Sequence, residues 1–179
     1  LSLWKASRYR FFLAVCLSLL GRVSLRLGRL DEAVSRLGES KTNFRDVGAE
    51  EEIPPVDARI AECRLALGNL DGALELVSGM LRRAGESNGM AKMVSLLERI
   101  RGHVLIQQGD LSGAREALEA SLAAAKERNN QFEAALTMLS LIEVDRFECL
   151  EPPLELVKES RTLLGRLKGR AEPPVVLAP

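Results

Sequence analysis

Few residues of this chain have side chains suited to covalent or metal chemistry. The sequence of 179 residues holds one histidine, His103, and three cysteines, Cys16, Cys63 and Cys149. The C-x-x-C spacing of zinc and redox sites is missing, and there is no second histidine to join a metal cluster. We expect reduced thiols, buried as small hydrophobic residues, in a cytoplasmic protein with no disulfide and no bound metal.

The common motifs of enzyme chemistry are also missing from the sequence. It contains no G-x-x-x-x-G-K-[ST] phosphate loop, no G-x-S-x-G turn, no H-E-x-x-H zinc pair and no dinucleotide fingerprint. A Cys-His or Ser-His arrangement would have to use His103. We therefore expect a chain that is not an enzyme, with no catalytic residue and no cofactor.

Charge is unevenly distributed at the start of the chain, although 25 basic and 25 acidic side chains cancel overall. Residues 1–30 carry six basic side chains and no acidic one, whereas residues 31–52 carry seven acidic and three basic ones. The basic cluster could contact phosphates of a nucleic acid, and the acidic stretch could neutralise it. Nucleic-acid contact through the basic N-terminal helix is an alternative that we rank below protein binding. The six basic residues are Lys5, Arg8, Arg10, Arg22, Arg26 and Arg29.

A short pattern that occurs three times indicates which elements must position these residues. Its glycines, Gly28, Gly68 and Gly109, lie 40 and 41 residues apart. A fixed period of this size is typical of one supersecondary unit that repeats and stacks. In each copy a small residue precedes the glycine by seven positions and an alanine follows it by five. The small residues are Gly21, Ala61 and Gly102, and the alanines are Ala33, Ala73 and Ala114.

Apolar residues recur at helical spacing on both sides of each glycine, which predicts antiparallel helix pairs. Each glycine would end the first helix in a left-handed conformation, and the small residues would mark a close approach of two helices. Asp31, Asp71 and Ser112 lie near the expected starts of the second helices, where they could cap free N–H groups. The predicted pairs are 5–27 with 31–47, 54–67 with 71–84, 87–108 with 111–128, and 131–147 with 153–168.

The last repeat departs from the pattern. The period places Cys149 where a glycine should stand, and Pro152 and Pro153 follow at the expected start of the second helix. An atypical final unit is common in stacked repeats. We predict an all-α fold, an α-solenoid of about four helix pairs over 1–168, with repeats at about 5–47, 54–84, 87–128 and 131–168. A Pro-rich tail follows at 169–179.

The order of small residue, glycine and alanine resembles the tetratricopeptide repeat family over roughly residues 5–168. The helix-ending proline of that family is missing, and Arg45, Gly85 and Lys126 stand at the matching places. The period exceeds the standard 34 residues, which resembles the long repeats of large bacterial signalling proteins. Stretches such as 57–63, 118–125 and 159–167 are similar to the carboxyl ends of actinobacterial proteins that carry a cyclase or DNA-binding output module and an ATPase module. The resemblance implies an interaction or regulatory module of a larger protein.

In the tetratricopeptide family the first helix of each pair lines a concave groove where peptides or partner helices dock. Carrying over the groove positions of the family gives one row of mixed charge, which suits a specific protein or peptide partner or an upstream domain of the same polypeptide. The implied groove residues are Ser18, Arg22, Arg26, Glu62, Arg99, His103, Gln107 and Glu143, with Ala58, Ala66, Leu139 and Phe147 beside them.

Other interpretations of the sequence stay open. A small ligand could bind within the superhelix, although the low aromatic content of 4% argues against a sugar. Trp4, Phe11 and Phe12 could supply an apolar patch for self-association through an end repeat. The apolar run at 11–20 follows basic residues as in a secretion signal, but it is too short to span a bilayer, and we interpret it as repeat core with no membrane partner.

Overall fold

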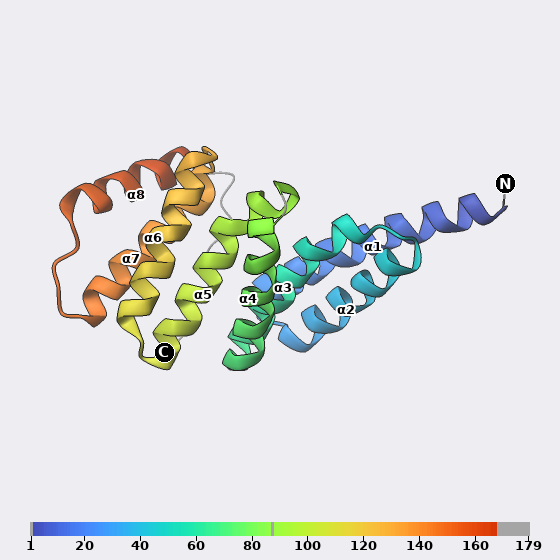
Figure 1. The fold of residues 1–179 in the computed structure, drawn as a ribbon, viewed down its shortest axis with the longest axis horizontal. Helices are drawn as coiled ribbons and strands as arrows, with labels where there is room; N and C mark the ends of the chain where they lie inside the picture. The colour runs from blue at the N-terminus through green and yellow to red at the C-terminus, as the bar shows by residue number, and fades with distance from the viewer. Residues whose placement is uncertain (1, 87, 168–179) are drawn as a thin grey trace. The chain divides into compact units, whose positions relative to one another are not determined.

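The computed structural model describes residues 2–86 and 88–167, and these residues form helices joined by short turns, with no strand among them (Figure 1). This confirms the all-α class, and eight α-helices lie within the described residues. The α-helices are α1 (Ser2–Arg26), α2 (Leu30–Asp46), α3 (Ile53–Ala66), α4 (Leu70–Glu86), α5 (Val94–Gln108), α6 (Leu111–Glu127), α7 (Gln131–Phe147) and α8 (Leu154–Leu167).

Two short 3-10 helices precede α3 and α5. η1 (Glu50–Glu52) leads into α3, whose first turn contains Pro54, the residue at which this helix was predicted to begin. η2 (Asn88–Met93) occupies the start of the predicted helix 87–108, so that α5 begins only at Val94. Asn and Gly at the start of this segment are weak helix formers, which explains the later start. The predicted tail 169–179 lies outside the described residues.

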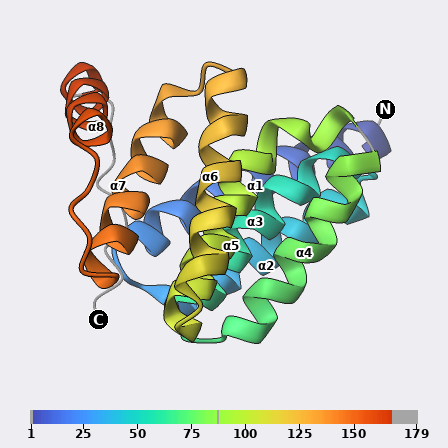
Figure 2. The same cartoon turned by 60° about the vertical axis from the view of Figure 1, so that its left-hand side comes forward.

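The chain divides into two units, Leu1–Leu76 and Val77–Pro179, with the division inside α4. In the first unit α2 packs against both α1 and α3. Its core contains Leu25, Leu37, Phe44 and Val56. In the second unit α5, α6, α7 and α8 each pack against the next helix along the chain (Figure 2). Each unit therefore has a hydrophobic core of its own.

Every helix end of the α1–α3 and α5–α7 regions uses the same turn. A residue one or two positions after the helix adopts a positive φ, and the N–H that follows it donates to a carbonyl five positions back, as from Asp110 N to Leu105 O at 3.0 Å. This Schellman arrangement satisfies carbonyls that the helix leaves unpaired. The predicted left-handed conformation of Gly28, Gly68 and Gly109 is confirmed. Among the described residues, those with a positive φ are Gly28, Gly48, Gly68, Gly109, Asn129 and Cys149.

The N-cap residues of the second helices lie two positions before the residues predicted from the sequence. The side chain of Asn69 accepts from Gly72 N at 3.0 Å, and that of Asp110 accepts from Gly113 N at 2.9 Å. Arg29 precedes α2 and makes no side-chain cap. The turn after each glycine is one residue long, so the helix begins before Asp31, Asp71 and Ser112, which lie inside the first turn of their helices.

The small residues of the repeat pattern mark close helix contacts, as predicted. A Cβ added to Gly21 of α1 would lie 2.7 Å from Cγ of Leu37 of α2. A Cβ added to Gly102 of α5 would lie 2.7 Å from Cγ of Leu118 of α6. Real Cβ atoms do not approach a neighbour this closely, so both helix pairs depend on glycine at these places.

The prediction that all three cysteines are buried was wrong for two of them. Cys63 is buried, but Cys16 on α1 and Cys149 after α7 are exposed, and all three are free thiols. Burial of the Cys63 thiol raises its pKa to about 12, and the charge of Glu62 acts in the same direction, against the opposing effect of Arg59. Exposure of Cys16 and Cys149 reflects the helix face and the turn on which they stand.

Candidate binding cavity between α7 and α8

The second unit contains a cavity of about 480 Å³ between α7 and α8. Five of the side chains along it are apolar and three are charged. The lining residues are Leu139, Ile142, Glu143, Arg146, Pro152, Val157, Ser160, Arg161 and Leu164. An apolar wall with a few charged groups is the usual composition of a binding site in a protein of this size.

Helix α8 is amphipathic, and its two faces have different roles. Leu156 and Leu163 pack against the hydrophobic clusters that α8 shares with α6 and α7. Val157, Arg161 and Leu164 line the cavity. Val157 and Leu164 directly follow Leu156 and Leu163, so they lie on a neighbouring face of the helix. When the two leucines dock against their clusters, this neighbouring face turns toward the cavity.

The charges along the cavity are not compensated by ion pairs with the rest of the described chain. Glu143 and Arg146 of α7 are exposed, as is Arg161 of α8. Among the ion pairs within residues 2–86 and 88–167, none involves these three side chains. A guanidinium presents a planar set of donors suited to a carboxylate. The cavity can therefore accept an apolar group together with an anionic one.

Neighbouring charges on α7 are paired with α6. Nη2 of Arg115 lies 2.6 Å from Oδ1 of Asp145, and the same guanidinium bonds to Glu148. Hydrogen bonds to Glu148 and Asp145 raise the pKa of Arg115 above its ordinary value, so the pair stays ionised. Arg115 thus fixes the C-terminal part of α7 against α6, next to the segment that lines the cavity.

The structure brings two of the predicted groove residues of α5 against α7. Nε of Arg99 lies 2.9 Å from Oε2 of Glu133, and both side chains are nearly buried. Oγ of Ser140 lies 3.0 Å from Nε2 of His103. These polar contacts link α5 to α7 across the face that the resemblance assigned to a partner. Gln107 is exposed at the end of α5.

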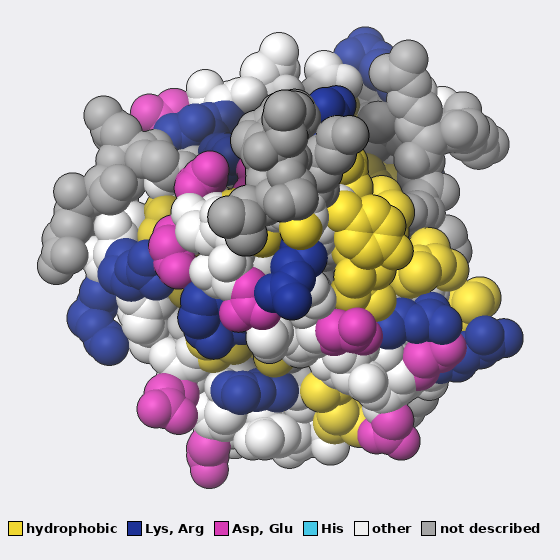
Figure 3. Space-filling view, turned by 90° about the vertical axis from the view of Figure 1, so that its right-hand side faces the viewer, with side chains coloured by type: hydrophobic (Ala, Val, Ile, Leu, Met, Phe, Trp, Pro, Cys, Tyr) yellow, Lys and Arg dark blue, Asp and Glu magenta, His cyan; other side chains and the backbone are white. Residues whose placement is uncertain are grey.

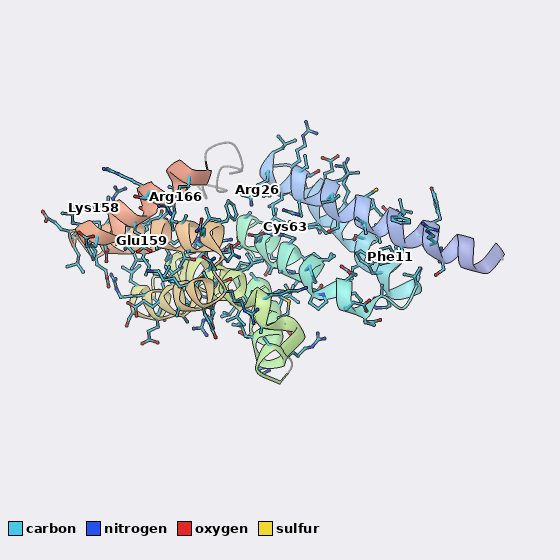
Figure 4. All side chains as sticks on the ribbon, turned by 90° about the horizontal axis from the view of Figure 1, so that it is seen from above. Phe11, Arg26, Cys63, Lys158, Glu159 and Arg166 are labelled. Atoms are coloured by element: carbon cyan, nitrogen blue, oxygen red, sulfur yellow. The ribbon has the colours of Figure 1, made fainter. Side chains whose placement is uncertain are left out.

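The predicted groove residues of α1 and α3 belong to the first unit. Ser18, Arg22 and Arg26 are half-buried on α1. Glu62 of α3 lies 2.6 Å from Nη1 of Arg59 and is paired along its own helix. Figure 4 labels Arg26 on α1 and Cys63 on α3.

Of the predicted groove residues, Leu139 and Glu143 line the cavity. Sequence reasoning missed Arg146 and Arg161, which provide its two positive charges. A signal was present, because Val157, Arg161 and Leu164 recur at i, i+4 and i+7 on a helix whose other face is apolar as well. Lys158, Glu159 and Arg166, which Figure 4 also labels on α8, do not line the cavity.

The basic cluster of the first unit is partly paired with the acidic stretch that follows it. Nη1 of Arg10 lies 3.3 Å from Oδ2 of Asp46, and Nη1 of Arg29 lies 3.8 Å from Oε2 of Glu32. Within the described residues, no group of three or more His, Cys, Asp or Glu side chains is arranged to hold a metal ion. None of the described helices is both long and apolar enough to cross a bilayer.

Comparison with known proteins adds no further assignment. No family model matches this chain, and no curated protein matches it either.

Proposed function

We propose that this chain is a non-catalytic protein-interaction module, and that the α7–α8 cavity binds a segment of its partner. The observation that carries the proposal is the composition of the cavity, where apolar side chains stand beside Arg146 and Arg161 without ion pairs to the rest of the described chain. An apolar side chain of the partner would enter between Ile142 and Leu164, and a carboxylate beside it would bond to the guanidinium groups.

The energetics favour this use of the cavity. Burying one Leu-sized side chain contributes about 1.5–3 kcal/mol. A charge-assisted hydrogen bond to a guanidinium contributes about 1.5–3 kcal/mol when it is shielded from water. One such anchor is enough for weak, specific binding, and further contacts along the exposed Phe147, Leu150 and Leu154 would strengthen it.

The wider setting is also part of the proposal. The repeat spacing and the close glycine contacts support a tetratricopeptide-like array, stacked as an α-solenoid, in a cytoplasmic bacterial signalling protein. Binding at one pair of helices would then stabilise one arrangement of the stack and bias the neighbouring modules. Signalling by a parent protein that lacks this region would test the regulatory part, because unchanged signalling contradicts it.

The partner site itself is tested by charge reversal. The double variant Arg146→Glu, Arg161→Glu removes both positive charges of the cavity, while Arg83→Glu, Arg128→Glu makes the same change at exposed residues that do not line it. A protein retained from lysate by the wild type and the control, but lost by the cavity variant, is then purified and titrated against all three. Equal affinity for all three proteins would refute the cavity as the partner site.

A small-ligand sensor is the second candidate, because a cavity of about 480 Å³ lies within the size range of small-molecule sites. The ligand would combine an apolar group with a carboxylate. Thermal unfolding of wild type and of Arg146→Glu, Arg161→Glu in the presence of short-chain and branched carboxylic acids separates the two candidates. A rise in Tm for the wild type alone would favour the sensor.

A further inference from the structure

Helix α1 carries a second apolar face that the first unit leaves exposed. Seven side chains between positions 9 and 27 point away from the core, and the six larger ones are between 47% and 71% exposed. The opposite side of α1 is already used, because Phe11, Ala14 and Leu25 belong to the core cluster of the unit. The exposed stripe consists of Tyr9, Phe12, Cys16, Leu19, Leu20, Val23 and Leu27.

The spacing of this stripe is that of a helix-packing seam. Tyr9, Phe12, Cys16, Leu19 and Val23 are separated by alternating steps of three and four residues. This is the a and d pattern of a heptad, which brings one line of apolar side chains against a partner helix. In the face of the molecule drawn in Figure 3, hydrophobic side chains form a patch with both basic and acidic side chains along its edge.

The matching residues of the second unit are buried. Equivalent helix ends and close contacts of the two units lie 81 residues apart in the sequence, as Gly28 and Gly109 do. By this offset the five seam positions of α1 correspond to residues that are between 0% and 8% exposed. The corresponding face is therefore covered in the second unit. The matching residues are Met90, Met93, Leu97, Ile100 and Val104.

The charged residues beside the seam indicate which kind of partner would bind there. Arg8 and Arg22 directly precede Tyr9 and Val23, which places them at g positions of the heptad. No acidic residue occurs in residues 1–30. Two antiparallel copies of α1 would bring the g-position arginines of both copies together along the seam, which is unfavourable. A helix with acidic residues beside its apolar stripe would instead form ion pairs with them.

An anionic membrane surface fits less well than a helix. Residues 1–76 contain eleven basic and eleven acidic side chains, so the unit has no net charge to attract it to acidic lipids. The acidic η1 segment and Asp46 lie in the same unit. A straight heptad seam matches another helix better than it matches a flat lipid surface.

We propose that the seam of α1 is a docking surface for an amphipathic helix whose apolar stripe is flanked by acidic residues. The apolar side chains of that helix would pack between Phe12, Leu19 and Val23, and its carboxylates would pair with Arg8 and Arg22. This surface belongs to the first unit and does not depend on the α7–α8 cavity.

Two designed peptides of about four heptads test the proposal. Both have Leu at a and d, and they differ only in having Glu or Lys at the e and g positions. The acidic peptide is expected to bind at least about tenfold more tightly than the basic one, and the preference should weaken with salt. The variant Arg8→Glu, Arg22→Glu should reverse the preference.

The position of binding is tested by a matched pair of variants and by a thiol. Leu19→Glu should lower affinity for the acidic peptide at least about tenfold, whereas Leu67→Glu, at an exposed leucine outside the seam, should leave it unchanged. Because Cys16 stands within the seam, the bound peptide should slow its modification by a thiol reagent and leave Cys149 unaffected. Circular dichroism of each variant verifies that the helices are intact.

Several results would overturn the proposal. Equal affinity for the acidic and basic peptides, or binding that survives Leu19→Glu, would show that the seam does not select an acidic helix. A concentration-dependent dimer in sedimentation experiments that Leu19→Glu abolishes would assign the seam to a second copy of the chain. Co-sedimentation with phosphatidylserine vesicles that the same variant abolishes would assign it to a lipid surface.

Discussion

The helix pairs α1–α2 and α5–α6 are built from the same contacts, yet they present different outer faces. Gly21 meets Leu37 in the first pair as Gly102 meets Leu118 in the second. The hydroxyl of Ser40 donates to Ala14 O, and that of Ser121 donates to Ser95 O, each at 2.7 Å. The internal contact between two helices is thus preserved while the residues that face outward differ in burial.

This comparison separates the role of backbone geometry from that of the side-chain face. Gly48 and Gly68 of the first unit correspond to Asn129 and Cys149 of the second, and all four adopt a positive φ. The turn geometry is therefore retained even where the glycine is replaced. In contrast, Leu19 of α1 is exposed where the corresponding Ile100 is buried. Repeat geometry alone does not decide which surface is available to a partner.

The largest expected difference is in the rates at which the three cysteine thiols react. Cys63 corresponds to Val144, and both are fully buried, whereas Cys16 and Cys149 are exposed. At about pH 8 the two exposed thiols should react with a disulfide reagent at the rate of a free thiol, and Cys63 should react only as the protein unfolds. Mass spectrometry of labelled peptides over time measures the three rates, and fast labelling of Cys63 would contradict its burial.

The raised pKa of Cys63 also predicts a direction for stability at alkaline pH. The thiol of the unfolded chain ionises near its ordinary pKa of 9.0, while the folded protein retains the proton up to about 12. The unfolded state therefore loses its proton first, and the free energy of unfolding falls as pH rises between these values. Urea titrations of wild type and Cys63→Val from neutral to alkaline pH should show a smaller decline in the variant.

The close glycine contacts predict the next largest effect. Gly102→Ala would place a Cβ 2.7 Å from Leu118, and the expected loss of stability is about 1–3 kcal/mol. Gly21→Ala should cost a similar amount in the first unit. Gly38→Ala is the control, because its Cβ would meet nothing within 4 Å, and it should stabilise α2 by about 0.5–1 kcal/mol. Urea unfolding of the three variants measures these differences.

The sequence was sufficient to predict the helices and their tight contacts because those features depend on residues close together in each repeat. Gly102 and Ala114 indicate both the turn and the packing by their spacing around Gly109. The cavity could not be predicted in this way, since it depends on how α8 docks after Pro152. The pairing of Arg99 with Glu133 joins residues on two different helices, and no local pattern indicates it.

An equal or smaller loss of stability is expected when the two buried serine hydroxyls are removed. Ser121→Ala removes hydrogen bonds to Ser95 O and to the hydroxyl of Thr137, which is also buried, at a cost of about 1–3 kcal/mol. Ser40→Ala removes one bond to Ala14 O and should cost about 1 kcal/mol. Equal losses in the two variants would mean that Thr137 contributes nothing through its contact with Ser121. The double variant Ser121→Ala, Thr137→Val tests this, because removing both polar partners should recover part of the loss.

The smallest effect concerns the left-handed turn residues. Gly109→Ala should destabilise the second unit by about 1 kcal/mol, because a Cβ is unfavourable at a φ of 81°. Cys149→Gly makes the reverse change, but relief of backbone strain at a φ of 57° is offset by the greater freedom of glycine in the unfolded chain. The expected gain is no more than about 0.5 kcal/mol. Cys149→Asn, which copies the residue at Asn129, should keep the turn without that entropic cost, so it should be at least as stable as Cys149→Gly. A lower stability for Cys149→Asn would show that the Cys149 turn depends on contacts that the Asn129 turn lacks.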